Sequence, residues 1–306
     1  MSTNVVLFLA TTLIWGSTWY AITFQLGAVD PAVSVAYRFL LAGFVLLAFL
    51  AVRRQPVMPR RDGWWLIGLA GLFNFALNYL LVYKATALLP SGLVAVAGSV
   101  LSLMNVVNAR LFLGQPIRPS VLGGGIMGVT GVLLLFMPEM AGGVLTGGAA
   151  VGFGLMMLSN YSASLGNMAV SRMRRAEMPL IGSTAWAMLV GAGLMALVAA
   201  LQGASFRVDA TLPYLLSLVY LSLVGSIAAF LCYFTLLGRM GPGRAGYIAI
   251  MTPVLALVVS TLFEDYRWTP SGALGLGLAV AGNLLVMAPG GMAGLWRGLR
   301  PRPRAA

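Results

Sequence analysis

Histidine is absent from the 306 residues of this chain, and cysteine occurs once, at Cys232. A single cysteine excludes an intrachain disulfide. The lack of histidine excludes His/Cys metal sites and Ser-His or Cys-His catalysis. The sequence therefore predicts no metal ion and no other cofactor. It also predicts that the protein is not an enzyme, since a membrane-embedded protease or transferase would need such groups or paired intramembrane Asp residues.

Charged side chains are also scarce. They make up 8% of the chain, whereas 60% of the residues are apolar; soluble globular proteins carry about 25% charged residues. The net charge of +12 comes from arginines in short clusters between long apolar runs. Such clusters set membrane orientation and do not form a phosphate-binding face. We therefore expect membrane lipids and a small-molecule solute as partners, and no nucleic acid. The oligomeric state stays open.

Ten apolar segments are long enough to cross a hydrocarbon core of about 30 Å, which takes roughly 20 helical residues. With proline, glycine and charge clusters as boundaries, they lie at 4–26, 31–52, 64–84, 91–111, 119–137, 147–171, 180–201, 211–237, 242–263 and 270–288. The sequence therefore predicts an all-α integral membrane protein with ten transmembrane helices. The segment 180–201, rich in Gly and Ala, could instead be a buried or re-entrant helix.

The basic residues predict which side each loop faces, because Lys and Arg accumulate on the cytoplasmic side. One set of loops and the C-terminal tail hold 15 of them, and the opposite loops hold three. The first group is Arg53, Arg54, Arg60, Arg61, Arg110, Arg118, Arg172, Arg174, Arg175, Arg239, Arg244, Arg297, Arg300, Arg302 and Arg304; the second is Lys84, Arg207 and Arg267. We therefore expect a multi-pass protein of a bacterial inner membrane with both termini in the cytoplasm.

The two halves of the chain resemble each other when the sequence is shifted by 151 residues. LFLGQPIRPS at 111–120 then aligns without a gap with LFEDYRWTPS at 262–271. The same shift pairs Gly124 with Gly275, Gly131 with Gly282 and Pro138 with Pro289. Spaced Gly and Pro matches are harder to obtain by chance than apolar ones, so the pattern indicates an internal repeat.

Each half of the chain holds five spans, an odd number, so the second half enters the bilayer from the opposite side. Such inverted halves can exchange conformations and open a shared central site to each side in turn. We expect one five-helix repeat at 1–138, a second at 147–289 and a basic cytoplasmic tail at 290–306.

WGSTW at 15–19 in the first span, AYRF at 36–39 in the second and the two aligned stretches carry a family resemblance. The chain resembles the drug/metabolite transporter superfamily, specifically its EamA-type ten-helix exporters, over essentially its whole length. It is most similar to the YddG branch of amino-acid exporters. The resemblance implies export of aromatic and other neutral amino acids.

The chain departs from this family at two positions of the fourth span. Gln115 stands where a Glu often follows Gly114, and Ser102 stands where Pro is common, whereas the second half keeps Pro253. Roles of the family residues at these two positions cannot be transferred to this chain.

Polar and aromatic side chains inside the spans outline a pathway, because lipid offers no hydrogen bonds. Asn74 and Asn78 lie on one face of the third span, and Asn160, Ser164 and Asn167 share a face of the sixth. The candidate substrate-binding residues are Trp15, Ser17, Asn74, Asn78, Tyr79, Tyr83, Ser99, Asn160, Ser164, Trp186, Tyr233 and Tyr247. Amides and rings suit an uncharged or zwitterionic solute. Alternatively, these residues join helices through hydrogen bonds of roughly 0.6–2 kcal/mol.

Arg38 is the only charged residue well within a span, about 10 Å from the span's outer end at 1.5 Å per residue. An ion at this depth needs partners. Arg38 could clamp a substrate carboxylate, or it could tie helix-end carbonyls together without any solute. The structural role is favoured, because the resemblance at AYRF does not depend on the substrate.

The spans contain no Asp, Glu or His, the side chains that usually relay protons through membranes. We therefore expect alternating access driven by the solute gradient, with small neutral, aromatic amino acids as solutes. The runner-up is export of a drug or another metabolite, such as an organic cation held by cation–π contacts. A non-transporting scaffold or sensor with the same fold is a third alternative.

Overall fold

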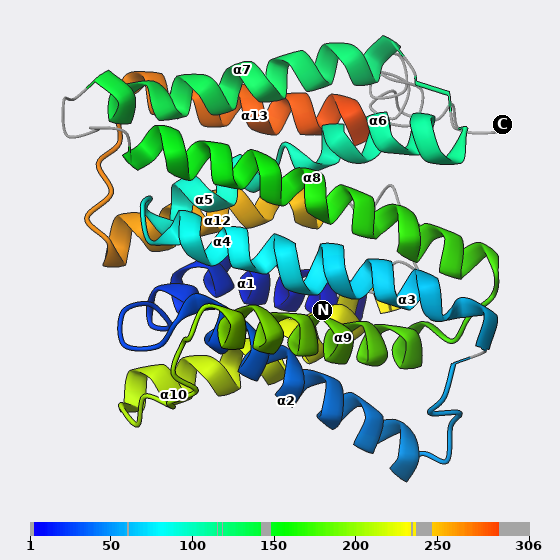
Figure 1. Ribbon diagram of the computed structural model, residues 1–306. Helices are drawn as coiled ribbons and strands as arrows, with labels where there is room; N and C mark the ends of the chain where they lie inside the picture. The colour runs from blue at the N-terminus through cyan, green and yellow to red at the C-terminus, as the bar shows by residue number, and fades with distance from the viewer. Residues whose placement is uncertain are drawn as a thin grey trace, which may run out of the picture.

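The computed structural model describes residues 3–59, 61–114, 116–117, 119–141, 148–233, 235–236 and 247–287, and within these ranges the regular structure is helical (Figure 1). Seven predicted spans are single helices: α1 (Thr3–Thr23), α2 (Pro31–Val52), α7 (Pro119–Ala141), α8 (Gly148–Arg175), α9 (Leu180–Leu201), α12 (Tyr247–Phe263) and α13 (Pro270–Met287). Among the described residues, six helical segments are both long and apolar enough to cross a membrane.

The other three spans are composite. The third consists of a 3-10 turn η1 (Arg61–Gly63), α3 (Trp64–Ala70), a π-helical segment η2 (Gly71–Leu77) and α4 (Asn78–Thr86). The fourth consists of α5 (Ser91–Gly98) and α6 (Leu101–Leu113), and the eighth of α10 (Leu212–Val219) and a second π-helical segment, η3 (Tyr220–Ala228). The prediction of an all-α membrane protein with ten helices is thereby confirmed.

Local signals in the sequence set several helix ends. The Asp30 carboxylate accepts the Ala32 N–H at 2.7 Å and so caps α2, whose first residue is Pro31. Gly114 ends α6 with a left-handed φ of +69°. The helix α8 runs on to Arg175, beyond the predicted end at 171, because arginines in a last turn interact favourably with the helix dipole.

The segment 180–201 is one continuous helix, α9, and it packs along α2. It is long and apolar enough to cross a membrane, and Leu197 and Leu201 are exposed, so neither the buried nor the re-entrant alternative applies. The helices alternate in direction, so the connections gather at two ends of the bundle (Figure 1). We name the end with Arg53, Arg61 and Arg174 the basic end, and the end with segments 24–30, 87–90, 202–211 and 264–269 the opposite end.

The structure repeats itself at the spacing seen in the sequence. Shifting η2 by 151 residues gives 222–228, which falls inside η3. The third and the eighth span, which are equivalent in the repeat, therefore each contain a π-helical segment. Such segments are rare in general and frequent at functional sites.

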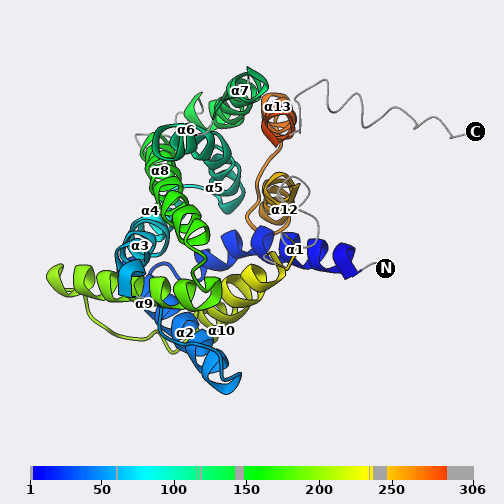
Figure 2. The same cartoon turned by 90° about the vertical axis from the view of Figure 1, so that its right-hand side faces the viewer.

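The helices α7 and α13, also equivalent in the repeat, pack against each other at the edge of the bundle and run in opposite directions (Figures 1 and 2). Gly131 approaches the backbone at Gly275, and Gly282 approaches the backbone at Gly124. The repeat pairs Gly131 with Gly282 and Gly124 with Gly275, so exchanging the halves converts one contact into the other. This is the geometry of an inverted-topology repeat, with its pseudo-two-fold axis between α7 and α13.

This glycine contact supports a first prediction. A Cβ at Gly131 would overlap the backbone of Gly275 and Ala279, whereas a Cβ at Gly123 of the same helix meets nothing within 4 Å. We expect Gly131→Ala to lower the unfolding free energy by about 1–3 kcal/mol, as overpacking does. Gly123→Ala is expected to leave it unchanged or raise it, because Ala is the better helix former. Thermal unfolding of both variants in detergent is the measurement, and equal melting temperatures would contradict the close contact.

Large apolar side chains cover the outside of the bundle. Leu13, Phe44, Leu197, Leu216 and Leu274 are all more than half exposed, yet each lies within a span. In water such a surface would be an aggregation hazard. It is the surface expected of helices that face lipid acyl chains.

Candidate functional site

A cavity of about 1160 Å³ lies in the middle of the bundle, between the two halves of the chain. Its lining combines amides and hydroxyls with aromatic and small apolar side chains. The polar and aromatic residues that line it are Trp15, Thr18, Trp19, Asn74, Phe75, Asn78, Tyr79, Ser99, Ser102, Asn105, Ser159, Asn160, Asn167, Ser171, Ser183, Thr184, Phe230, Tyr233 and Thr252, together with Arg38 and Arg174. A cavity of this size and composition suits a small organic solute.

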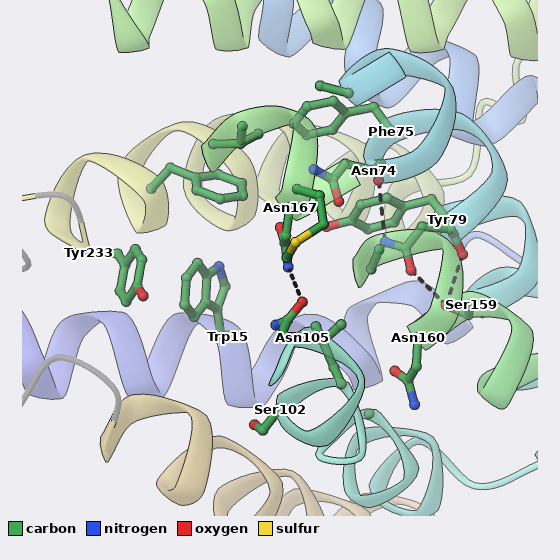
Figure 3. A pocket seen from close by; sticks show the side chains of 18 of the residues that line it. Trp15, Asn74, Phe75, Tyr79, Ser102, Asn105, Ser159, Asn160, Asn167 and Tyr233 are labelled. Carbon is green, nitrogen blue, oxygen red and sulfur yellow. Dashed lines mark hydrogen bonds between the residues drawn. The ribbon is translucent and has the colours of Figure 1, made fainter. Parts of the chain in front are cut away.

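One side of the cavity is rich in amides (Figure 3). Asn167 of α8 donates its Nδ2–H to Oδ1 of Asn105 in α6 at 3.2 Å. Ser159, two turns earlier in α8, donates to Oδ1 of Asn78 at 2.6 Å, and Asn78 donates to the Asn74 carbonyl at 3.3 Å. The amides of three different spans are thereby held in fixed orientations around the cavity.

Aromatic rings form another side of the cavity, around Trp15 of α1. The Trp15 ring meets Phe230 edge-on at 5.6 Å between centroids and tilts against Tyr233 at 5.2 Å. Figure 3 shows Trp15 and Tyr233 on the side away from Asn160 and Ser159. Because Trp15 belongs to the first half and the other two rings to the second, this aromatic wall bridges the halves.

The fourth span is interrupted where it lines the cavity. Between α5 and α6, the N–H groups of Ser99 and Val100 reach back only three residues, to the carbonyls of Val96 and Ala97. The Ala97 carbonyl also accepts the Nδ2–H of Asn160 at 2.8 Å. Interrupted helices beside a central cavity are a common way to expose backbone groups to a transported solute.

The cavity reaches the basic end, where Leu113, Pro116, Arg174 and Leu180 line it. No described residue that lines the cavity belongs to the connections at the opposite end. Contacts between different elements close the bundle at that end. There the Glu264 carboxylate accepts the N–H of Ser91 at 3.1 Å and its hydroxyl. On the other flank, Gln25 donates to the Tyr214 carbonyl at 3.0 Å and to the Ser217 hydroxyl at 2.6 Å.

Most of the residues predicted from the sequence lie around this cavity. Trp15, Asn74, Asn78, Tyr79, Ser99, Asn160 and Tyr233 line it, and so does Arg38. The side chain of Tyr247 lies outside the part of the chain that the structure describes. The remaining four predicted residues are placed elsewhere.

These four residues are not among the described residues that line the cavity, and each of them contacts other groups of the protein. Ser17 shares a hydrogen bond of 2.7 Å with the Tyr220 hydroxyl, and Ser164 accepts from Asn108 at 2.9 Å. Trp186 donates to the Val57 carbonyl at 2.8 Å, and Tyr83 is fully buried next to Arg38. Their role in solute binding stays a prediction.

The candidate residues from sequence omitted Asn105, Ser159 and Phe230, which all line the cavity. A signal for two of them existed. Ser159 precedes Asn160 in the sixth span, and Phe230 is the counterpart of Tyr79 at the repeat shift of 151 residues. No sequence pattern marked Asn105.

Comparisons with known proteins agree with this geometry. A model of the EamA-like transporter family matches residues 2–137 and again residues 150–288. YedA of Escherichia coli K12, described as an uncharacterized inner membrane transporter, is 30% identical over 277 residues, which cover 90% of this chain and 87% of YedA. An E. coli K12 protein named "Probable amino-acid metabolite efflux pump" is 25% identical over 92% of this chain and 91% of its own length.

A solved crystal structure of a protein superposes with a TM-score of 0.66 at 22% identity, covering 92% of this chain and 96% of that chain. At this identity the likeness concerns the fold alone. The family model covers both halves of the chain, which accords with the duplicated architecture. The chain therefore belongs to the EamA-like transporter family, and it is a transporter of small molecules rather than an enzyme.

Proposed function

We propose that this protein exports small neutral, mainly aromatic, amino acids from the cytoplasm of a bacterium, as the YddG branch of the family does. The central cavity carries the proposal. It offers rings to stack on an aromatic side chain, and amides and hydroxyls to bind polar groups. Two proteins of similar sequence, one of Escherichia coli and one of Salmonella typhimurium, bear the name "Probable amino-acid metabolite efflux pump" and support this solute class.

The orientation and domain boundaries form part of the proposal. The excess of arginines supports a cytoplasmic basic end, with both termini on that side. The structure then has its cavity open to the cytoplasm, the state in which an exporter would load solute. The two family matches support repeats at 1–138 and 147–289, followed by a cytoplasmic tail at 290–306.

The cavity also supports gradient-driven transport by alternating access. Among its described lining residues there is no Asp or Glu, and the chain has no His, so the lining lacks the groups that relay protons in membranes.

The runner-up solute, an organic cation, would find rings for cation–π contacts. The lack of a lining carboxylate and the presence of two arginines make a cation the poorer fit.

Flux in reconstituted liposomes tests this proposal. Liposomes loaded with labelled neutral amino acids are expected to release them down their gradient, and collapse of an imposed pH gradient should not change the rate. Trp15→Ala should reduce the flux of phenylalanine about two- to tenfold more than that of leucine, because ring pairs contribute about 0.5–1.5 kcal/mol beyond area burial.

Trp65→Ala is the matched control, since Trp65 is 55% exposed and does not line the cavity. It should leave the ratio of phenylalanine flux to leucine flux unchanged. Release of a quaternary amine without release of any amino acid would overturn the proposed substrate class in favour of the organic cation.

A further inference from the structure

Arg38 is a buried cation with unused hydrogen-bonding capacity. It is 1% exposed and lies in α2, near the closed end of the cavity that it helps to line. Its Nε and Nη2 both point to the Ser226 hydroxyl oxygen at 3.4 Å, and Nη1 has no hydrogen-bond partner. A guanidinium presents five N–H donors. A single distant hydroxyl therefore leaves most of its donors unused.

The described part of the chain offers Arg38 no counter-ion. The Glu264 carboxylate is bound by Ser91, the Asp30 carboxylate by the Ala32 N–H and the Asp209 carboxylate by Thr211, all at the opposite end. The guanidinium carbon lies over two rings, with the centroid of Tyr79 at 4.6 Å and that of Phe39 at 5.2 Å. Ring faces attract a cation, but they do not accept its N–H bonds as an anion does.

A second unused group lies beside Arg38. The Tyr83 side chain is fully buried next to the guanidinium, whose charge and N–H groups act on the hydroxyl oxygen, and no acceptor in the described chain takes the hydroxyl proton. The Ser226 hydroxyl cannot serve in the same way, because it already donates to the Leu221 carbonyl at 2.9 Å. The Nη1 of Arg38 and the Tyr83 O–H are therefore two donors without an acceptor at the same place, and an anionic oxygen pair would match both.

The structural role favoured from the sequence does not match this geometry. Tying helix ends together would require backbone carbonyls as acceptors, whereas in the described chain Arg38 interacts with the side chains of Ser226 and Tyr83. The only other charged residue among the described lining of the cavity is Arg174, exposed at the basic end. Both charges at the cavity therefore have the sign that attracts a carboxylate.

We propose that Arg38, with the Tyr83 hydroxyl, binds the carboxylate of the transported solute at the closed end of the cavity. This inference rests on the proposed function and assigns the substrate class more narrowly: a solute with a free carboxylate, whose side chain lies toward the ring of Trp15. Arg38 of the first half already contacts Ser226 of η3 in the second, so the carboxylate would bind where the two halves meet.

Ligand binding to the purified, full-length protein tests the proposal. Phenylalanine and phenyllactate, which keep the carboxylate, should bind at least about tenfold more tightly than phenylalaninamide, which lacks it. A tenfold ratio is expected because a hydrogen bond to a charged group usually stabilises a complex more than a hydrogen bond to a neutral group does. Equal binding of phenylalanine and phenylalaninamide by the wild type would overturn the proposal, and this comparison requires no variant to fold.

Variants then assign the effect to Arg38. Arg38→Gln should remove the preference for carboxylate over carboxamide, Arg38→Lys should keep part of it, and Tyr83→Phe should reduce it about threefold or more while folding is retained. Arg207→Gln is the control and should keep the full preference, because Arg207 is exposed at the opposite end and does not line the cavity. An unchanged preference in folded Arg38→Gln would overturn the subsite.

The two proposals fail in different ways. If amino acids cross the membrane but their amides cross equally well, the carboxylate subsite is wrong and the amino-acid function stands. If phenyllactate binds through Arg38 while no amino acid binds or crosses, the subsite stands and the proposed amino-acid function is wrong.

Discussion

A covalent bridge between positions 91 and 264 is expected to stop transport completely, and breaking the bridge should restore it. Ser91 begins α5 in the first half of the chain, and Glu264 follows α12 in the second. The Glu264 carboxylate accepts the backbone N–H and the hydroxyl of Ser91. A carboxylate at a helix N-terminus is favoured by the helix dipole and the free N–H groups there.

The reason for a complete effect is geometric. The cavity is closed at the opposite end, and alternating access requires that end to open while the basic end closes. The contact between Ser91 and Glu264 must then separate in every cycle. The native contact is non-covalent and can be broken each time, whereas a covalent bridge cannot, so the bridged protein stays in one state.

The chain is well suited to this experiment, because Cys232 is its only cysteine. Ser91→Cys and Glu264→Cys would be combined in a Cys232→Ser background and joined by a short bis-methanethiosulfonate reagent. Flux would be measured in liposomes before bridging, after bridging and after reduction. The unbridged variant should transport, because the bonds of Gln25 still close the other flank of this end.

The control pair is Asp209→Cys with Thr211→Cys, whose side chains bond to each other within one connection at the opposite end. Bridging them constrains no contact between elements and should leave flux unchanged. Full flux through protein bridged at 91 and 264 would show that this end does not open in transport.

The fold could be predicted from the sequence because its main determinants are local or periodic. Apolar length, helix-capping residues such as Asp30 and Gly114, and arginine clusters mark the span ends one by one. The repeat shift of 151 residues then relates the two halves. The π-helical segments η2 and η3 were not predicted, because no residue type distinguishes a π turn from an α turn in an apolar run.

The site could be predicted only in part, because helical spacing gives the face of a residue but neither its depth nor its partner. Tyr79 and Tyr83 lie one turn apart, yet Tyr79 lines the cavity and Tyr83 is fully buried. Asn160 and Ser164 also share a face, but the Ser164 hydroxyl accepts from Asn108 of α6. Such partners come from distant parts of the chain and leave no local pattern.

The alternative between solute binding and helix joining can be decided with a matched pair of amides, Asn160 and Asn108. Both are at least 97% buried, and both link the fourth span to the sixth: Asn160 donates to the Ala97 carbonyl and Asn108 to the Ser164 hydroxyl. They differ in position, because Asn160 lines the cavity at the break between α5 and α6, whereas Asn108 is not among the lining residues.

Asn160→Leu is therefore expected to lower the transport rate per folded molecule about tenfold, whereas Asn108→Leu should leave that rate within about twofold. Each variant loses a buried hydrogen bond of about 1 kcal/mol, so both should lose similar stability in thermal unfolding. Only Asn160→Leu also removes an amide from the cavity and frees the Ala97 carbonyl at the break. Equal rates for the two folded variants would mean that Asn160 only joins helices, and the amide side of the cavity would then have to bind solute through Asn74, Asn105 and Asn167 instead.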